Sequence, residues 1–208
     1  LEINKSLKGP CIIVEPNATI VVEPEWEVSI NKESEIILNR YKNIHENEID
    51  ISRPDPVMLE IFNNLFMSIA EQMGVTLQKT SSSVNIKERL DFSCAIFDKN
   101  GDLIANAPHI PVHLGSMSQS VKSILRQNQG TIKKGDFFVL NSPYSGGTHL
   151  PDISVIAPVF DKTGTKLLFF TGSRGHHADV GGTTPGSMPP YSNSINDEGV
   201  IIDNFLLV

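Results

Sequence analysis

The 208-residue sequence contains few cysteines and few basic residues, and it has no long hydrophobic run. Its 17 Lys and Arg residues are outnumbered by 24 Asp and Glu residues, which gives a net charge of −7 with His neutral. Nucleic-acid-binding proteins concentrate positive charge against phosphates, so this balance argues against a nucleic-acid partner. No apolar stretch reaches the ~20 residues that span a bilayer, and we therefore expect no membrane segment.

The two cysteines, Cys11 and Cys94, are distant in the sequence and cannot make a disulfide framework. We therefore expect a reducing, cytoplasmic compartment. Both cysteines are interpreted as packing residues rather than nucleophiles, because Cys94 lies within an apolar run. The chain also lacks the G-x-x-x-x-G-K-[ST] phosphate loop, and no nucleotide-binding motif is present.

The fold class predicted from the sequence is α+β, with three segments of different character. Residues 1–38 contain short apolar runs separated by Glu-Pro turns, which is typical of a small β-rich module. Residues 39–54 are polar and charged with no sustained period, so we interpret them as a linker. Residues 55–208 alternate helical and strand patterns and are predicted to form a mixed α/β domain.

The clearest predicted helix begins with Asp55 as N-cap and Pro56 in the first helical position. Gly74 is expected to end it. Its apolar residues recur at three- and four-residue steps, and we interpret this stripe as core packing: Val57, Met58, Ile61, Phe62, Leu65, Ile69 and Met73.

The rest of this domain is predicted to consist of short strands, tight turns and one short helix. An Asn-Gly turn predicts a hairpin between residues 92–97 and 103–104. Three further elements are predicted: a second hairpin between residues 155–160 and 166–170, a helix over 116–127, and a buried strand over 137–140.

Five of the six histidines lie between His109 and His177, and two of them begin a His-x-x-Asp pair. The pairs are His149 with Asp152 and His176 with Asp179, each in a Gly-rich setting beside a predicted strand end. Imidazole and carboxylate groups at this spacing can converge on Mn, Fe or Zn. The alternative is a turn in which the aspartate caps backbone amides. Spacing alone does not choose between His176 and His177.

His109 and His113 stand beside Pro108 and Pro111, and the prolines predict an extended segment here rather than a helix. One interpretation gives these histidines a substrate-binding or acid–base role. The other is a rigid segment with one hydrogen-bonded histidine. Glu88 and Asp91 likewise suit either a catalytic carboxylate clamp or a structural ion-pair cluster.

Four ordered motifs resemble the hydantoinase B/oxoprolinase family. They are SSSVNIKERLDFSCA at 81–95, APHIPVHLG at 107–115, GTHLPD at 147–152 and SRGHHADVGG at 173–182. The TPGSMPP stretch at 184–190 is most similar to the ATP-dependent 5-oxoprolinase branch of that family.

Residues 1–38 are similar to the C-terminal tail of the hydantoinase A half, which in this family has an actin-like ATPase fold. The resemblance therefore implies a chain that spans the junction of a fused enzyme, with only the N-terminal portion of the hydantoinase B-like domain. A first residue other than Met and an apolar last segment agree with that expectation.

The resemblance implies ATP-dependent hydrolysis of 5-oxo-L-proline to L-glutamate. The A half would bind ATP and Mg and phosphorylate the lactam oxygen, and the B half would open the ring. The implied ligands of a divalent metal ion (Mn, Zn or Fe) are His149, Asp152 and His176, with His176 favoured over His177 because the family pattern is anchored on the first histidine. Asp179 is a weaker candidate that could instead orient the histidine.

The partners implied are a lactam substrate, the ATPase half of the same chain and a second copy in a homodimer. The isolated chain is expected to be inactive without its ATPase half. Three alternatives stay open: an N-methylhydantoinase, an acetone-carboxylase-like enzyme of the same family, and a non-catalytic structural junction.

Overall fold

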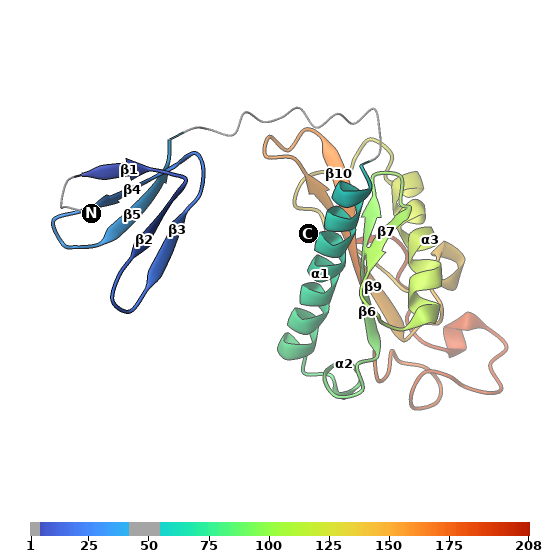
Figure 1. Cartoon of the computed structure of the whole chain (residues 1–208). Coiled ribbons are helices and arrows are strands. Elements are labelled where there is room, and N and C mark those ends of the chain that lie inside the picture. Colours follow the sequence, from blue (N-terminus) through green and yellow to red (C-terminus); the bar gives the residue numbers. More distant parts are fainter. Residues whose placement is uncertain (1–4, 42–54) are drawn as a thin grey trace. The chain divides into compact units, whose positions relative to one another are not determined.

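The computed structural model describes residues 5–41 and 55–208, which belong to two separate units (Figure 1). The first unit comprises Leu1–Pro54 and the second Asp55–Val208. Within the described ranges, no helix is long and apolar enough to cross a membrane.

The first unit is a small β structure. Its two antiparallel sheets are a three-stranded sheet in the order β1-β4-β5 and a two-stranded β2-β3 pair. The strands are β1 (Ser6–Lys8), β2 (Cys11–Val14), β3 (Thr19–Val22), β4 (Trp26–Ile30) and β5 (Ile36–Arg40). Val22 and Val28 are buried between them.

The β-rich character predicted for residues 1–38 is confirmed, and two details of this unit differ from the sequence pattern. β1 was not predicted, because its three residues are all exposed and carry no alternating pattern. β5 ends at Arg40, two residues inside the predicted linker of 39–54, since its backbone pairs with β4 through that residue. Residues 42–54 of the predicted linker lie outside the described part of the chain.

The second unit contains one antiparallel six-stranded sheet in the order β11-β8-β9-β10-β6-β7. The strands are β6 (Phe92–Asp98), β7 (Leu103–Asn106), β8 (Phe138–Leu140), β9 (Asp152–Phe160), β10 (Leu167–His176) and β11 (Phe205–Leu206). The helices are α1 (Pro56–Thr80), α2 (Val84–Lys87) and α3 (Pro111–Gln127), with 3-10 turns η1 (Pro143–Ser145) and η2 (Ile195–Asp197). Both predicted hairpins, β6-β7 and β9-β10, are confirmed.

In Figure 1 strands β6, β9 and β10 lie between α1 and α3. The alternation of side chains along β6 explains this layering, because successive residues of a strand point to opposite faces. Phe92 and Cys94 pack with Met73 and Leu77 of α1. Ala95 and Phe97 pack with the residues of α3.

Helix α1 begins as predicted, since the Asp55 side chain accepts a hydrogen bond from Val57 N at 2.9 Å. The prediction that Gly74 ends it is wrong. Gly74 is buried in the helix, which continues to Thr80, because a residue without a side chain allows close packing there.

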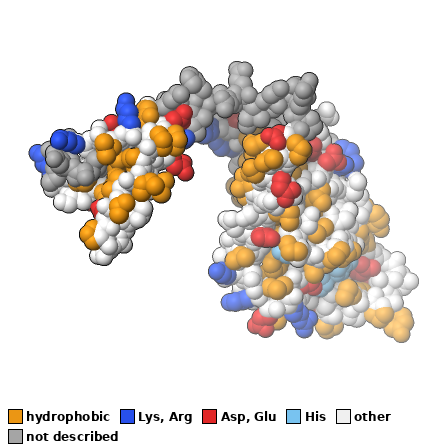
Figure 2. Space-filling view, in the orientation of Figure 1, with side chains coloured by type: hydrophobic (Ala, Val, Ile, Leu, Met, Phe, Trp, Pro, Cys, Tyr) orange, Lys and Arg blue, Asp and Glu red, His pale blue; other side chains and the backbone are white. Residues whose placement is uncertain are grey.

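The prediction that the apolar stripe of α1 forms core is also wrong for most of its members. The buried positions of α1 are the small residues Ala70 and Gly74, which let the helix approach its neighbours. Figure 2 shows hydrophobic side chains at the surface over this helix. Five residues of the stripe are exposed: Val57, Ile61, Phe62, Leu65 and Ile69.

Helix α3 begins at Pro111 rather than at the predicted position 116, so the extended segment predicted around His113 is wrong. Proline is well tolerated in the first turn of a helix, where its missing N–H has no partner to lose. His113 therefore lies on α3, whereas His109 precedes the helix.

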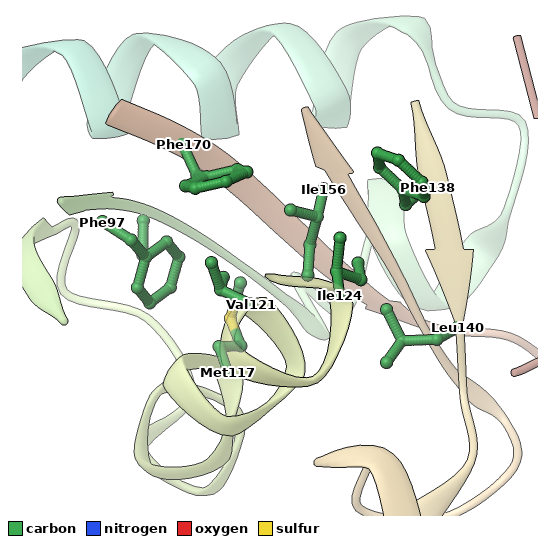
Figure 3. Close-up of a cluster of buried hydrophobic side chains, with 9 residues drawn as sticks. Phe97, Met117, Val121, Ile124, Phe138, Leu140, Ile156 and Phe170 are labelled. Atoms are coloured by element: carbon green, nitrogen blue, oxygen red, sulfur yellow. The ribbon is translucent and has the colours of Figure 1, made fainter. Parts of the chain in front are cut away.

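The main core fills the space between the sheet and α3 (Figure 3). Gly172 at the centre of β10 makes this possible, since a Cβ there would lie 3.0 Å from the Phe97 ring and 3.1 Å from Met117. The buried members of this core are Ala95, Phe97, Met117, Val121, Ile124, Phe138, Leu140, Ile156 and Phe170.

Replacing Phe97 by Ala is expected to lower the free energy of unfolding of the second unit by about 3–5 kcal/mol, the cost of emptying a buried aromatic site. Urea unfolding followed by circular dichroism measures this change. Phe62→Ala is the matched control, because Phe62 is 41% exposed on α1 and should change stability far less. Equal losses in the two variants would contradict the core described here.

Candidate functional site

The site is built on the pairing of β9 with β10. The antiparallel register places His176 directly opposite Asp152 and Arg174 opposite Ser154. Because side chains two residues apart share a face, the His176–Asp152 pair and the Arg174–Ser154 pair form adjacent rows. Arg174 also contacts residues of α3, so both rows face that helix.

His149, from the loop before β9, completes a compact group with this pair. His149 Nδ1 lies 3.1 Å from one oxygen of Asp152, and His176 Nδ1 lies 3.0 Å from the other. The two histidines also meet directly, with His149 Nε2 3.1 Å from His176 Nδ1. Two residues 27 positions apart are thus brought onto one carboxylate.

This donor set fits a divalent metal ion. One ligand atom from each of His149, Asp152 and His176 lies within 4.8 Å of the others. Two imidazole nitrogens and a carboxylate oxygen are the donors used by catalytic Zn, Fe and Mn sites. Asp152 is completely buried, whereas the His149 and His176 side chains are 35% and 19% exposed, so the group is open on the histidine side.

Asp152 is held by two further side chains. His113 on α3 places Nε2 3.2 Å from Asp152 Oδ2, and the Thr148 hydroxyl donates a hydrogen bond to the same oxygen. Burial raises the pKa of Asp152, but hydrogen bonds from His113, His149 and Thr148 outweigh burial and hold it well below its usual range. The carboxylate is therefore ionised at neutral pH.

His113 is itself fixed by β6. Its Nδ1 lies 3.2 Å from Ser93 Oγ, and Ser93 Oγ accepts a hydrogen bond from Ile110 N at 3.1 Å. If the Ser93 hydroxyl donates to Nδ1, then Nε2 carries the proton toward Asp152. His113 is 2% exposed, so the structure gives it a contact with the carboxylate rather than with solvent.

Arg174 is a functional neighbour that sequence reasoning did not single out. It is fully buried, and all its hydrogen-bond partners are neutral: Ser154 Oγ, Ser116 Oγ, Ser120 Oγ, His113 O and Gly146 O. Burial lowers the pKa of Arg174 to about 10, and the charge of Asp152 acts in the opposite direction. The signal was available, because two-residue alternation along β10 puts Arg174 on the face of His176.

Of the other predicted site residues, Asp91 lies close to this group, whereas Glu88 and Asp179 lie outside it. Asp91 Oδ1 is 3.9 Å from His113 Nε2, and Asp91 O accepts a hydrogen bond from His176 N. Glu88 caps α2, and its exposed side chain makes no hydrogen bond or ion pair within residues 5–41 and 55–208. Asp179 is outside the group, and its carboxylate accepts hydrogen bonds from Gly181 N, Gly186 N and Ser187 Oγ.

His109 faces a different pocket, lined by α1. Its Nδ1 accepts a hydrogen bond from Cys94 N at 2.9 Å, and its ring packs on Phe92 with centroids 5.0 Å apart. Cys94 is buried, and burial raises the pKa of its thiol to about 12, as expected for a packing residue. Cys11 is only half-buried in β2.

Comparison with known proteins identifies the family. Residues 55–208 match the family model described as hydantoinase B/oxoprolinase. The chain belongs to this family. The candidate site lies entirely within the matched residues.

Named relatives share much of the chain but are far longer. The chain is 61% identical over 154 residues to 5-oxoprolinase 1 of Arabidopsis thaliana and 55% identical over 161 residues to 5-oxoprolinase of Saccharomyces cerevisiae. These matches cover 74% and 77% of this chain but only 12% of each relative.

A solved structure confirms the α+β fold class. The ATP-dependent caprolactamase of Pseudomonas jessenii matches with a TM-score of 0.66 and 32% identity. The match covers 74% of this chain and 26% of the caprolactamase chain.

Two histidines of this hydantoinase B domain have pKa values shifted in opposite directions. The hydrogen bond to Asp152 raises the pKa of His149, whereas burial, together with the neighbouring His176, lowers the pKa of His177. His149 and His177, which belong to different motifs, are thus distinguished by their surroundings.

In chelator-treated protein, we expect His149 to titrate at a higher pH than His177. A raised folded-state pKa stabilises the fold fully below the unfolded value of about 6.5, and this contribution is lost as pH rises through the folded pKa. NMR titration of the imidazole protons measures both groups in one sample. Asp152→Asn should bring the His149 pKa down; an unchanged value in that variant would contradict the assigned contact.

Proposed function

We propose that this domain is the ring-opening part of an ATP-dependent 5-oxoprolinase, which hydrolyses 5-oxo-L-proline to L-glutamate. The observation that carries the proposal is the His149, Asp152 and His176 group, found in a chain 61% identical over 154 residues to a 5-oxoprolinase. In the proposed reaction, an ATPase half of the whole protein, with its own Mg, activates the lactam oxygen by phosphorylation. Water then opens the ring and releases phosphate.

The domain's own residues are proposed to prepare a divalent ion site, with Mn, Zn or Fe as the candidates. Asp152 supplies a carboxylate that is ionised at neutral pH, because three hydrogen bonds hold its pKa well below the usual range. His113 and Thr148 orient that carboxylate. When bound, such an ion supplies Lewis acidity that polarises a carbonyl oxygen.

The open side of the group is where substrate would arrive. His149 and His176 are partly exposed, so a small cyclic amide could reach them, whereas the Asp152 side chain is buried from solvent. Asp91, partly exposed and close to His113, is proposed to act on water at this side. Glu88 remains a candidate catalytic carboxylate, and Asp179 a weaker candidate that could orient the histidine.

The proposal extends to the whole protein. We propose a homodimer in the cytoplasm whose chains each join residues 1–38, as the tail of an ATPase half, to this domain. The free cysteines agree with a reducing compartment. The isolated 208-residue chain would not turn over substrate, because it has no nucleotide-binding motif of its own.

His149→Ala and His176→Ala are each expected to weaken Mn²⁺ or Zn²⁺ binding to the 208-residue chain at least 100-fold. Isothermal titration calorimetry at pH 8 gives the affinities. His177→Ala is the matched control and should leave binding unchanged. His113→Ala, which removes the contact of His113 Nε2 with the ligand Asp152, should cost about 10- to 100-fold, the usual effect of losing a hydrogen-bond partner of a ligand. Undiminished binding by the His149 variant would reject the ligand assignment.

A domain exchange tests the reaction. Replacing the matching segment of the Arabidopsis 5-oxoprolinase 1 by residues 55–208 should retain ATP-dependent glutamate formation from 5-oxo-L-proline. The same exchange carrying His149→Ala should lose it, with normal folding checked by gel filtration. Phosphate release with N-methylhydantoin, or with acetone and bicarbonate, but not with 5-oxo-L-proline, would instead favour another reaction of the family.

A further inference from the structure

A second pocket of about 510 Å³ lies between α1 and the segment that leads into α3. It shares no residue with the histidine–aspartate group. Its lining is Glu71, Gly74, Val75, Gln78, Arg89, Leu90, Phe92, Ala107, Pro108, His109 and Ile110. The reaction proposed above uses none of these side chains, so the pocket needs its own account.

Helix α1 supplies one wall through residues three, four and seven positions apart. Glu71, Gly74, Val75 and Gln78 share this spacing and therefore lie on one face. At Gly74 an added Cβ would lie 2.8 Å from Cε1 and 2.9 Å from Nε2 of His109. A glycine inside a helix is less favourable than alanine, and here it lets the imidazole reach the helix backbone.

The imidazole of His109 presents one defined donor at this wall. Nδ1 is occupied as acceptor of the Cys94 N–H, so the neutral ring carries its proton on Nε2. Burial lowers the pKa of His109, which keeps the ring neutral. The Phe92 ring packs against it and restricts its rotation.

Two opposite charges line the same pocket without pairing. Glu71 and Arg89 make no ion pair with each other or with any group in residues 5–41 and 55–208. Gln78 donates its Nε2–H to Lys87 O, which leaves its amide oxygen as an acceptor. The backbone bends sharply beside Arg89, because Leu90 has φ of +58°. The pocket thus offers a cation, a carboxylate, one N–H donor and one oxygen acceptor.

We propose that this pocket binds a small amino-acid-like molecule, with its carboxylate on Arg89 and the His109 Nε2–H and its nitrogen donor toward Glu71. A cation and a carboxylate that line one pocket suit a ligand that carries both an anionic carboxylate and an N–H group. 5-Oxo-L-proline and L-glutamate both have this chemistry. The inference is based on the residues that line the pocket, and only the choice of these two probes rests on the proposed function.

Isothermal titration of the 208-residue chain in chelator-containing buffer tests the proposal without turnover or metal. We expect at least one of 5-oxo-L-proline and L-glutamate to bind, and glutarate, which lacks the nitrogen, to bind at least 10-fold more weakly. A lactam that binds better than L-glutamate identifies a second substrate-binding pocket, separate from the open side of the histidine–aspartate group, and the reverse order a product-binding pocket. Failure of both probes, or equal binding of glutarate, overturns the proposal.

Two exposed side chains provide variants that preserve the fold. Arg89→Gln and Glu71→Gln should each weaken the bound probe at least 10-fold. Arg126→Gln on α3 and Glu60→Gln on α1 are matched controls outside the pocket and should have no effect. Binding that survives Arg89→Gln overturns the assignment. Metal affinity and activity of the exchanged domain are measured separately, so failure here leaves the proposed function intact.

Discussion

The buried carboxylate of Asp152 is the constraint on which the site depends. A fully buried charge is costly unless it is hydrogen-bonded, and this one is contacted by His113, Thr148, His149 and His176. Those side chains come from α3, the loop before β9, and β10. The contacts that stabilise this carboxylate therefore connect three elements at the proposed site.

Arg174, two residues before His176 on β10, is a second buried charge on the same face of the sheet. A buried guanidinium with only neutral hydrogen-bond partners bonds β9, α3 and the η1 turn at once. Its charge and that of Asp152 partly offset each other within the same face. Removing the charge of either Arg174 or Asp152 would leave the other charge buried without compensation. The face that carries the histidine–aspartate group thus also borders the hydrophobic core, and Gly172 allows α3 to pack close to the sheet there.

The two faces of the sheet carry different chemistry. The α3 face bears the histidine–aspartate group, whereas α1 and the segment before α3 enclose the His109 pocket. Strand alternation along β6 explains the division, because Ser93 reaches His113 on one side while Phe92 and Cys94 contact His109 and α1 on the other. Four of the five histidines that sequence composition grouped together, His109 on one side and His113, His149 and His176 on the other, are therefore divided into two environments.

Local sequence was enough to predict the two hairpins of the second unit, the β-rich character of residues 1–38, the N-cap of α1 and the His149 and Asp152 motif. Local turn chemistry and two-residue periodicity carry that information, since they depend on near neighbours. Only the tertiary structure decided which face of α1 is buried, that α3 begins at Pro111, and that Asp179 holds a loop while Arg174 backs the site. Those outcomes depend on strand register and on close packing at Gly74 and Gly172, which join residues far apart in the chain.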